Sequence, residues 1–574
     1  MRSDHNFDLI VIGAGGAGMT AALFAAIEGL QVVVLESTEH VGGTTAYSGG
    51  TTWIPNTHLA STVDAKDNID KARDYLTRVI GGFGKPALID AFLANGPAAV
   101  RKLEDASEVR FRAFASHPDY QSEVEGATPF GRALEPLPFD GRRLGEAFSL
   151  VRPPIPEFTL FNGMMVDRYD IGHLLQMTRS WRSFCHSIAL FGRYAADRVH
   201  HPRGTRLVMG NALVARLLQS LRQRNVAIWI RTQVKEIISG DGRAVGVRAV
   251  RDGELHELGA RRGIVLAAGG FNRSAALRSE LIGSVAPYSA VAPGSKGEAI
   301  ELAVKLGGRT GTRNFDNALW APVSVRKRPD GSTAVFPHFI MDRGKPGTVV
   351  VNQAGKRFLN ETTSYHLFGH AMIEAHRREP CIPAYLIADR RALEAYGLGM
   401  VRPGGRGVAY SLGDGYLVEG RSLDELAQKL DIDPAALRES VEQINRAADS
   451  GIDPAFGRGT TLYQRNLGDP AVGPNPTLGR VEHAPFYAVS LYPGDIGASC
   501  GLLTDENACV LDGEDRPVPG LYAVGNDMNS MMGGTYPGPG ITLGPAVAFA
   551  YLAVKHVLRR RIGTSTGTQD VSTV

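Results

Sequence analysis

The stretch Phe7-Asp-Leu-Ile-Val-Ile-Gly13-Ala-Gly15-Gly16-Ala-Gly18 decides the fold of this chain. Its apolar first half predicts a buried strand over Phe7–Ile12, and the glycines that follow predict a tight turn. An apolar helix is expected from Met19 to about Gly29, and Gln31–Leu35 (Gln-Val-Val-Val-Leu) predicts a second buried strand. A strand, a helix and a strand in this order form a βαβ unit with parallel strands. The sequence therefore predicts an α/β fold.

The first glycine-rich turn has the spacing Gly-x-Gly-x-x-Gly, directly between a strand and a helix. Glycines there permit a tight turn and let the backbone approach a pyrophosphate at the helix N-terminus. Glu36 ends the second strand, where a carboxylate can accept hydrogen bonds from adenosine ribose hydroxyls. An ordinary βα turn beside a surface Glu is the weaker interpretation. We expect a dinucleotide to contact Gly13, Gly15, Gly16, Ala17, Gly18, Glu36 and Ser37.

Three further features indicate which dinucleotide this is. A second Gly/Ser/Thr-rich loop, Val41–Gly50, follows Glu36 closely, whereas NAD domains usually continue the β-α-β alternation there. Strands near 227–268 form a meander, and a late strand and turn, Gly520–Gly525, precede a helix whose positive N-terminus can stabilise a reduced flavin. These features favour FAD. The added contacts expected are Gly42, Gly43, Thr44, Thr45, Ser48, Gly49, Gly50, Val234, Ala268, Gly269, Gly525, Asn526, Ile541 and Leu543.

The middle of the chain has a different texture, with short strands, Pro-rich loops and clear helices. One helix is expected to start at Ser422, with Glu425 completing a capping box. The next begins at Asp433 and ends before Gly451. We expect a nucleotide-binding domain interrupted by an inserted domain. The predicted divisions are 1–284, the inserted 285–490, the return of the first domain at 491–561, and a disordered tail at 562–574.

Composition excludes several classes of protein. The net charge of +3 over 574 residues, without a basic patch, argues against a nucleic-acid partner. The four cysteines show no CxxC spacing, and no metal site is expected. The N-terminus lacks the apolar stretch of a signal peptide. The sequence also has no run of about 18 apolar residues, so no membrane span is expected. These observations favour a cytoplasmic protein, in at most loose contact with a membrane.

The residues at 7–56, 225–271 and 517–555 resemble the FAD-binding parts of the fumarate reductase/succinate dehydrogenase flavoprotein superfamily. The resemblance implies a Rossmann-like FAD-binding domain with an inserted α+β substrate domain. Some members attach FAD through a His after the acidic residue. Thr44–Tyr47 contains no His, so we expect noncovalent FAD. Fumarate-reductase-like members need Arg and His near the flavin, and Met531–Gly540 has neither.

Three separated segments instead resemble the 3-ketosteroid Δ1-dehydrogenases. These are Tyr536-Pro-Gly-Pro-Gly540, Phe111-Arg-Ala-Phe114 with Pro118-Asp-Tyr120, and Gly355–Glu361 followed by Tyr365–Gly369. Together they make the resemblance cover most of the chain. It includes relatives that desaturate smaller cyclohexanone-type ketones.

The resemblance implies a role for four residues. Tyr536 and the backbone N–H of Gly540 hold the ketone oxygen, Tyr365 takes the α-proton, and Tyr120 hydrogen-bonds to Tyr365. The chemistry is physically consistent, because an enolising carbon needs donors at its oxygen and a base at its hydrogen. His366 and the His200-His201 pair are competing acid/base candidates, of which the pair is expected at the surface.

The function expected is FAD-dependent 1,2-dehydrogenation of a cyclic ketone, either a 3-ketosteroid or a smaller cyclohexanone-type ring. The electron acceptor is not identified by the sequence, and a quinone, an electron carrier and oxygen all stay open. Reduction of an activated alkene acid and a non-catalytic FAD-binding subunit are the alternatives. The chain is longer than the ketosteroid dehydrogenases mainly at 140–205, where Met and aromatic residues are expected to pack, or to form a lid.

Overall fold

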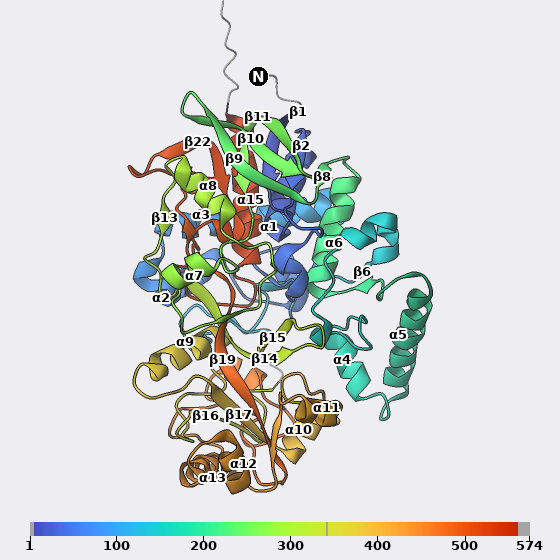
Figure 1. Ribbon diagram of the computed structural model, residues 1–574, viewed down its shortest axis with the longest axis vertical. Coiled ribbons are helices and arrows are strands. Elements are labelled where there is room, and N and C mark those ends of the chain that lie inside the picture. Colours follow the sequence, from blue (N-terminus) through green and yellow to red (C-terminus); the bar gives the residue numbers. More distant parts are fainter. Residues whose placement is uncertain (1–4, 340–341, 561–574) are drawn as a thin grey trace, which may run out of the picture.

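A computed structural model describes residues 5–339 and 342–560 of the chain, so the tail predicted at 562–574 lies outside the described residues. Two large sheets, one of eight strands and one of seven, lie toward opposite ends of the molecule (Figure 1). Helices accompany both sheets, which confirms the mixed α/β fold class. The smaller elements are α2 (Ile69–Ile80), α7 (Ala275–Leu281), α8 (Glu298–Lys305), α10 (Arg390–Tyr396), α11 (Val408–Gly413), α14 (Leu462–Asn466), β3 (Thr52–Trp53), β4 (Phe111–Ala113), β5 (Ala133–Pro136), β6 (Phe139–Asp140), β7 (Arg206–Leu207), β13 (Thr310–Gly311) and β20 (Gly501–Leu502).

The eight-stranded sheet joins the two ends of the chain. Its main path runs β21 (Cys509–Leu511), β22 (Pro517–Ala523), β11 (Glu254–Leu266), β1 (His5–Ile12), β2 (Val32–Leu35) and β8 (Ala227–Trp229). The strands β22, β11, β1, β2 and β8 are parallel to one another in that order. The parallel core of these strands, at 9–12, 32–35 and 263–266, is apolar because parallel sheets are covered on both faces.

The helix after the first glycine turn, α1 (Gly16–Ile27), begins three residues before the predicted Met19. The C-terminal helix α15 (Leu543–Arg559) packs against it, and α3 (Pro86–Ala106) packs against α15. A further helix, α6 (Met209–Arg222), lies beside α1 (Figure 1). This layer brings the start of α15 close to the start of α1.

The predicted meander is formed by β9 (Thr232–Gly240), β10 (Arg243–Arg251) and β11, which pair antiparallel. Both hairpin turns have left-handed backbone at both central residues, with φ of 51° and 70° at Asp241 and Gly242, and 50° and 85° at Asp252 and Gly253. That conformation is why Asp-Gly pairs stand there. The turns predicted at these two pairs are confirmed.

The seven-stranded sheet has the order β15 (Thr333–Pro337), β14 (Ala318–Lys327), β19 (Phe486–Ala498), β17 (Ala384–Asp389) and β16 (Thr348–Val351), and β12 (Tyr288–Ser289) and β18 (Val418–Gly420) also pair with β19. The helices α12 (Leu423–Leu430) and α13 (Pro434–Ser450) cover it, and α9 (Tyr365–His376) packs against β14. Ser422 caps α12, and Gly451 ends α13 with φ of 75°. The strand β19 runs across position 490, and the predicted domain divisions remain a prediction.

The segment 140–205 forms two helices, α4 (Arg168–Leu175) and α5 (Trp181–His200), at the side of the molecule (Figure 1). Met164 and Met165 pack inside, as predicted. Phe191 of α5 also packs, against the cluster around Met164 and Leu190. The packing interpretation is wrong for Trp181, which is 78% exposed, and for Phe184, which is also exposed. This helix has few neighbours that could cover its apolar face.

Candidate active site

The first glycine turn is shaped so that only glycine fits at two of its positions. A side chain at Gly13, which has φ of 104°, would place its Cβ 2.3 Å from the Ala267 carbonyl oxygen. One at Gly18 would lie 1.9 Å from the Gly13 carbonyl oxygen. By contrast, a Cβ at Gly15 would meet no described atom within 4 Å. The turn therefore packs on its inner side and is open at Gly15.

The second predicted loop lies directly against the first. Gly42 forms an isolated parallel bridge with Gly15, and its N–H donates to the Ala14 carbonyl at 2.7 Å. The N–H of Gly16 donates to the Thr45 hydroxyl at 3.2 Å. The neighbouring Thr44 hydroxyl accepts a hydrogen bond from the Ala292 N–H at 3.0 Å. In the same loop Gly43 packs against Gly15, and Gly49 lies beside Thr51. Gly50 packs against Gly210, whose N–H donates to the Ser48 carbonyl at 3.0 Å.

Glu36 is buried at the end of β2 rather than free at the surface. One carboxylate oxygen accepts from the Ala14 N–H at 2.9 Å, and the other accepts from the N–H and the hydroxyl of Thr38. The carboxylate thus fastens the first glycine turn to the end of β2. Ser37 and Thr38 lie beside Gly294 of the middle segment. Sequence reasoning assigned Glu36 only to a ribose and missed this structural use.

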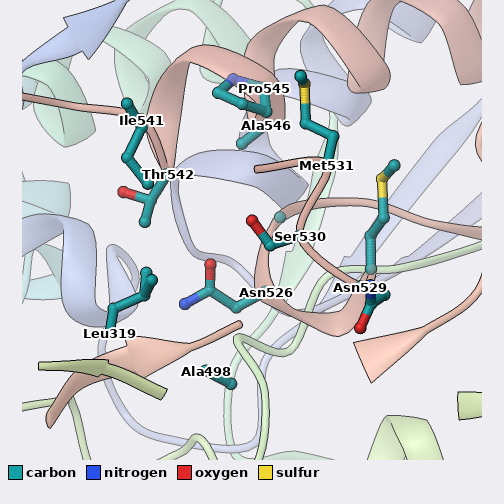
Figure 2. Close-up of a pocket in the computed structure, with 12 residues that line it drawn as sticks. Leu319, Ala498, Asn526, Asn529, Ser530, Met531, Ile541, Thr542, Pro545 and Ala546 are labelled. Carbon is teal, nitrogen blue, oxygen red and sulfur yellow. The ribbon is translucent and has the colours of Figure 1, made fainter. Parts of the chain in front are cut away.

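The late turn meets the same turn from the other side. Gly525 has φ of 62°, and a Cβ there would lie 2.7 Å from the Ala17 Cβ. Leu543, at the start of α15, lies beside Gly16. Asn526 and Ile541 line a pocket together with Leu319, Met531 and Thr542 (Figure 2). Of the predicted contacts, Val234 is buried within β9, paired with Ala249 of β10, and does not line this pocket.

One buried carboxylate in this region was missed by the sequence reasoning. Asp527 accepts hydrogen bonds from the N–H groups of Ala268 and Gly270, at 2.5 and 2.8 Å, and so fixes the loop around Gly269. Burial raises the pKa of Asp527 to about 6, and the backbone donors oppose that rise. Its place beside the predicted Gly525-Asn526 turn was the only signal for it.

Three of the four candidate catalytic residues, the tyrosines, come together. The Tyr120 hydroxyl donates to the Tyr365 hydroxyl at 3.1 Å, and both side chains are buried. The ring of Tyr365 lies edge-on to that of Tyr536, with centroids 5.0 Å apart, and the rings of Tyr120 and Tyr536 stack at 5.7 Å. Three phenols from distant parts of the sequence therefore share one enclosed site.

Burial dominates the electrostatics of these phenols. It raises the pKa of Tyr536 to about 12 and the pKa values of Tyr120 and Tyr365 well above their ordinary value. Mutual repulsion between the phenolates adds to the rise for Tyr365. The three groups are neutral donors at neutral pH, and the hydrogen bond from Tyr120 is available to a phenolate at Tyr365.

The loop carrying Tyr536 and Gly540 is held by buried polar contacts. The Pro537 carbonyl accepts from the Tyr120 N–H at 2.9 Å and from the Tyr75 hydroxyl at 2.5 Å. Gly540 has φ of 93°, and a side chain there would meet the Thr51 carbonyl oxygen at 2.3 Å. Among the described residues, the Gly540 N–H donates to no protein acceptor.

Tyr120 is held from its own segment as well. The preceding residue, Asp119, accepts from the Trp53 indole N–H and pairs with Arg132, each at 2.8 Å. Arg132 also makes a two-pronged ion pair with Asp67, and all three charged side chains are almost fully buried. Such a satisfied buried network fixes geometry rather than adding much stability.

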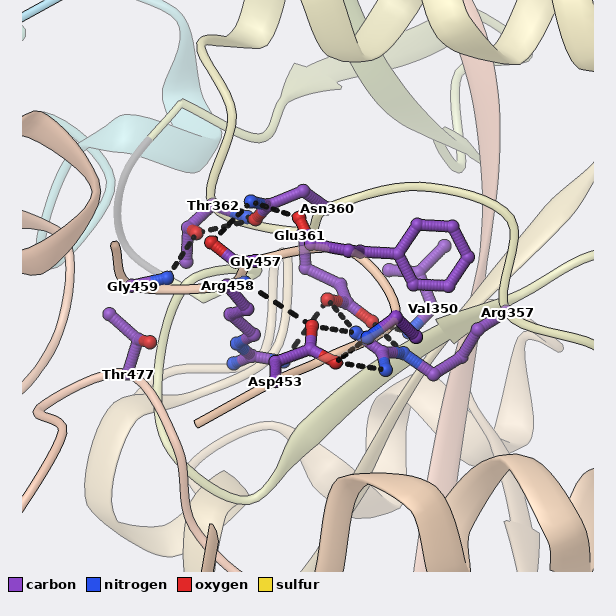
Figure 3. A network of polar contacts seen from close by, with 12 residues as sticks. Val350, Arg357, Asn360, Glu361, Thr362, Asp453, Gly457, Arg458, Gly459 and Thr477 are labelled. Atoms are coloured by element: carbon purple, nitrogen blue, oxygen red, sulfur yellow. Dashed lines mark hydrogen bonds and ion pairs between the residues drawn. The ribbon is translucent and has the colours of Figure 1, made fainter. Parts of the chain in front are cut away.

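Tyr365 is the first residue of α9, which the Ser364 side chain caps. The segment before it is tied down by the buried Arg357, whose guanidinium bridges Glu361 and Asp453 (Figure 3). The guanidinium nitrogens of Arg357 lie 2.8 to 3.2 Å from the carboxylate oxygens of these two acids. The Gly355–Glu361 stretch quoted in the resemblance is thus a scaffold for Tyr365.

The competing histidines take other roles. The Nδ1 atom of His366 accepts from the Trp320 N–H at 3.1 Å, and its Nε2 lies 3.2 Å from Asp316. An Nδ1 that accepts a hydrogen bond carries no proton, so this ring is held as the neutral Nε2–H form. His200 is exposed, as expected of the pair, whereas His201 is half-buried against Phe148.

Two residues beside Tyr120 were not found from the sequence. The ring of Tyr463 lies 4.7 Å from that of Tyr120. The fully buried Arg343 donates to backbone carbonyls that include those of Phe339 and Thr363, which flank the site. Neither residue stands in a motif that the sequence reasoning could use.

The fold and the site together define a flavoprotein. A family model described as an FAD binding domain matches residues 8–543. The 3-oxosteroid 1-dehydrogenase of Mycolicibacterium smegmatis is 35% identical over 563 residues, which is 96% of this chain and 96% of that protein. The 4-oxocyclohex-2-ene-1-carboxylate 5-dehydrogenase of Sinomonas cyclohexanicum is 35% identical over 560 residues, 96% of this chain and 94% of that protein.

The crystal structure of 3-ketosteroid delta1-dehydrogenase from Sterolibacterium denitrificans, in complex with 1,4-androstadiene-3,17-dione, has a TM-score of 0.89 to this structure. It is 35% identical, and the match covers 96% of this chain and 99% of that chain. The chain therefore belongs to the 3-oxosteroid 1-dehydrogenase family of FAD-dependent oxidoreductases, and the family expected from the sequence is confirmed.

Proposed function

We propose that this protein uses FAD to remove two hydrogens from adjacent ring carbons of a cyclic ketone, giving the conjugated enone. One observation carries the proposal: Tyr120, Tyr365 and Tyr536 meet in one buried site, next to a loop whose Gly540 N–H is unused by the described protein. The substrate is a 3-ketosteroid or a smaller cyclohexanone-type ketone.

The residues present fit FAD. The opening at Gly15 and the hydroxyl of Thr45 lie where a pyrophosphate meets the start of α1. The pocket at Asn526 and Ile541 lies at the start of α15, whose positive end suits the flavin pyrimidine. The absence of His in Thr44–Tyr47 supports noncovalent attachment. When bound, FAD supplies the acceptor for a hydride from the β-carbon.

The protein's own part in the chemistry concerns the ketone. The Tyr536 hydroxyl and the Gly540 N–H donate to the carbonyl oxygen, which gains negative charge as the ring enolises. Tyr365 takes the α-proton in its phenolate form and becomes a neutral phenol, and the hydrogen bond from Tyr120 stabilises that phenolate before the transfer. The enclosed site keeps water away from the enolate.

No described feature favours the two alternatives over this function. Reduction of an activated alkene acid calls for cationic groups at the loop that bears Tyr536, and Met531–Gly540 has no Arg or His. A non-catalytic FAD-binding subunit would not need three phenols gathered at the Gly540 loop.

The test is an anaerobic titration of the FAD-loaded protein with cyclohexanone, larger alicyclic ketones and 4-androstene-3,17-dione. We expect at least one cyclic ketone to bleach the flavin absorbance, with the matching enone formed in equal amount. Bleaching by none of these ketones, together with turnover of fumarate by the chemically reduced protein, would establish the alkene-acid alternative instead.

We place the protein in the cytoplasm, in at most loose contact with membranes. The reduced flavin passes its electrons to a quinone, an electron carrier or oxygen. Within the residues that the structure describes, no helix is long and apolar enough to cross a membrane. The exposed apolar side chains of α5 support a surface contact only. Reoxidation rates of the reduced protein with each acceptor would rank the three.

A further inference from the structure

Arg168 is a cation without an acidic partner, close to the candidate catalytic residues. It is the first residue of α4, and a capping box between Asp167 and Asp170 holds that end of the helix. Throughout the described ranges, no carboxylate lies within ion-pair distance of its guanidinium. The acid that most affects it, Glu135, is already paired with Arg112.

A short series of contacts connects Arg168 to the proposed base. Its guanidinium carbon lies 5.2 Å from the centroid of the Phe114 ring. Phe114 packs edge-on against His117 at 5.3 Å, and His117 lies 6.2 Å from the ring of Tyr120. The hydroxyl of Tyr120 reaches Tyr365 at 3.1 Å. Two side chains, Phe114 and His117, therefore connect the cation to the ring of Tyr120.

Arg168 lies at the protein surface, and its guanidinium is close to other positively charged or neutral groups. The side chain is exposed to solvent, yet the dense protein around it lowers the pKa of its guanidinium. Nearby, the Nδ1 atom of His117 is buried without a hydrogen-bond partner. Lys345 adds a second positive charge, although its ammonium already donates to the Gly468 carbonyl at 2.7 Å. The acids on the same helix turn, Asp167 and Asp170, pair with Arg206. Glu135 pairs with Arg112, so Arg168 remains free to meet a substrate anion.

A planar guanidinium without a partner suits a carboxylate, which it can bind through two parallel hydrogen bonds. We infer that Arg168 binds a carboxylate carried by the substrate at a position remote from the ketone. The preferred substrates are then ketone rings that bear an acid group. This inference rests on the proposed ketone dehydrogenation and names the substrate class for it. Arg168 is a specificity-determining residue, because it makes no contact with the reacting carbons.

The experiment compares 4-oxocyclohexanecarboxylate with its methyl ester, which differs in charge but not in the ketone. The apparent Kd of each is obtained from the concentration dependence of flavin bleaching by the FAD-loaded protein. We expect the parent protein to bind the acid more tightly than the ester. In Arg168→Gln the Kd of the acid should rise about 10- to 100-fold, so that the ratio of the two Kd values moves toward one.

Two further variants sharpen the result. Arg168→Lys keeps the charge but loses the planar fork, so it should recover part of the preference for the acid. Arg179→Gln removes an exposed arginine from the turn between α4 and α5. In this control the ratio of the Kd values of acid and ester should match that of the parent protein. A 3-ketosteroid with a side-chain carboxylate, compared with 4-androstene-3,17-dione, shows whether the acid is carried on a small ring or on a steroid.

The inference is overturned if Arg168→Gln raises the Kd of the acid and the Kd of the ester by the same factor, since Arg168 would then act on the site as a whole. It is also overturned if the parent protein binds neither the ring acid more tightly than its ester nor the steroid acid more tightly than 4-androstene-3,17-dione. In both cases neutral ketones would still bleach the flavin, and the proposed function would stand. If no ketone of any charge bleaches the parent protein, the proposed function fails and this inference fails with it.

Discussion

At the scale of single residues, the site depends on phenols whose protons are held more tightly than usual. Burial keeps Tyr536 neutral, with its pKa at about 12, so it is a hydrogen-bond donor at any pH the protein meets. The same burial raises the pKa of Tyr365, so in the resting state it is a neutral phenol and only its minor phenolate form can act as the base. Its proton transfer therefore depends on the enolate being stabilised at the same moment.

We expect Tyr365→Phe and Tyr536→Phe each to slow flavin reduction by a cyclic ketone by at least about 100-fold, because each removes one proton carrier or donor. FAD content should stay at one per chain in both. Stopped-flow absorbance under anaerobic conditions measures the rate. Tyr410→Phe, at an exposed position, is the control. Reduction within a few-fold of the parent rate in either site variant would contradict the assignment.

His117 titrates in a different range. Burial, followed by the charge of Arg168, lowers its pKa from 6.5 to about 3. A folded-state pKa below the unfolded one gives stability that is complete above about pH 6.5 and is lost as the pH falls toward 3. Acid therefore favours the unfolded chain through this residue.

His117→Asn should make stability less dependent on pH across that window. Urea unfolding at pH 7.5, 6.0 and 4.5 gives the free energy of unfolding for both proteins. The difference between parent and variant should narrow, or change sign, as the pH falls. A difference that stays constant from pH 7.5 to 4.5 would show that the folded and unfolded pKa values of His117 are the same.

At the scale of elements, the cofactor cradle is made by close packing of loops against the first turn of α1. Gly13, Gly18 and Gly540 each stand where a Cβ would overlap a backbone oxygen. The loops at 42–45 and 525–526 reach the same turn from either side. Small changes in this packing therefore act on cofactor binding before they act on chemistry.

Gly18→Ala should abolish retention of FAD through gel filtration, because its Cβ would lie 1.9 Å from the Gly13 carbonyl oxygen. Gly192→Ala is the matched control, since that helical position has open space around it and Ala favours helix. The ratio of flavin to protein absorbance measures retention. A full complement of FAD in Gly18→Ala would show that the turn can open without cost.

At the scale of the whole molecule, α5 presents an uncovered apolar face. Trp181, Phe184, Ile188 and Val199 lie on one side of the helix by their spacing and are all exposed. Arg179 and Arg182 flank the Trp end, also exposed. Apolar side chains beside arginines match the interfacial layer of an anionic membrane.

Trp181→Ser with Phe184→Ser should lower co-sedimentation with vesicles that contain anionic lipid, by several-fold at low salt. Leu255→Ser removes an exposed apolar side chain from the distant strand β11 and should bind vesicles as the parent protein does. Equal binding by all three proteins would remove α5 from any membrane contact, and no binding by the parent would remove the contact altogether.

Much of this protein follows from local sequence. Continuous apolar runs followed by closely spaced glycines specify the βαβ start, because a buried parallel strand must be apolar and a close backbone approach requires glycine. The Asp-Gly turns at 241 and 252 and the helix caps at Ser422 and Asp433 are equally local. The family resemblance predicts that Tyr120, Tyr365, Tyr536 and Gly540 belong to one site.

Only the tertiary structure decided which residues far apart in sequence form hydrogen bonds or pack against each other. Glu36 accepts a hydrogen bond from Ala14, and Asp527 accepts one from Ala268 and so fixes the loop at 268–270. Tyr463 packs against Tyr120, and Arg343 binds backbone carbonyls that flank the same site. The same holds for the exposed face of α5 and for the unpaired charge of Arg168. Burial and charge pairing depend on neighbours brought close by folding, and no local pattern of residues encodes them.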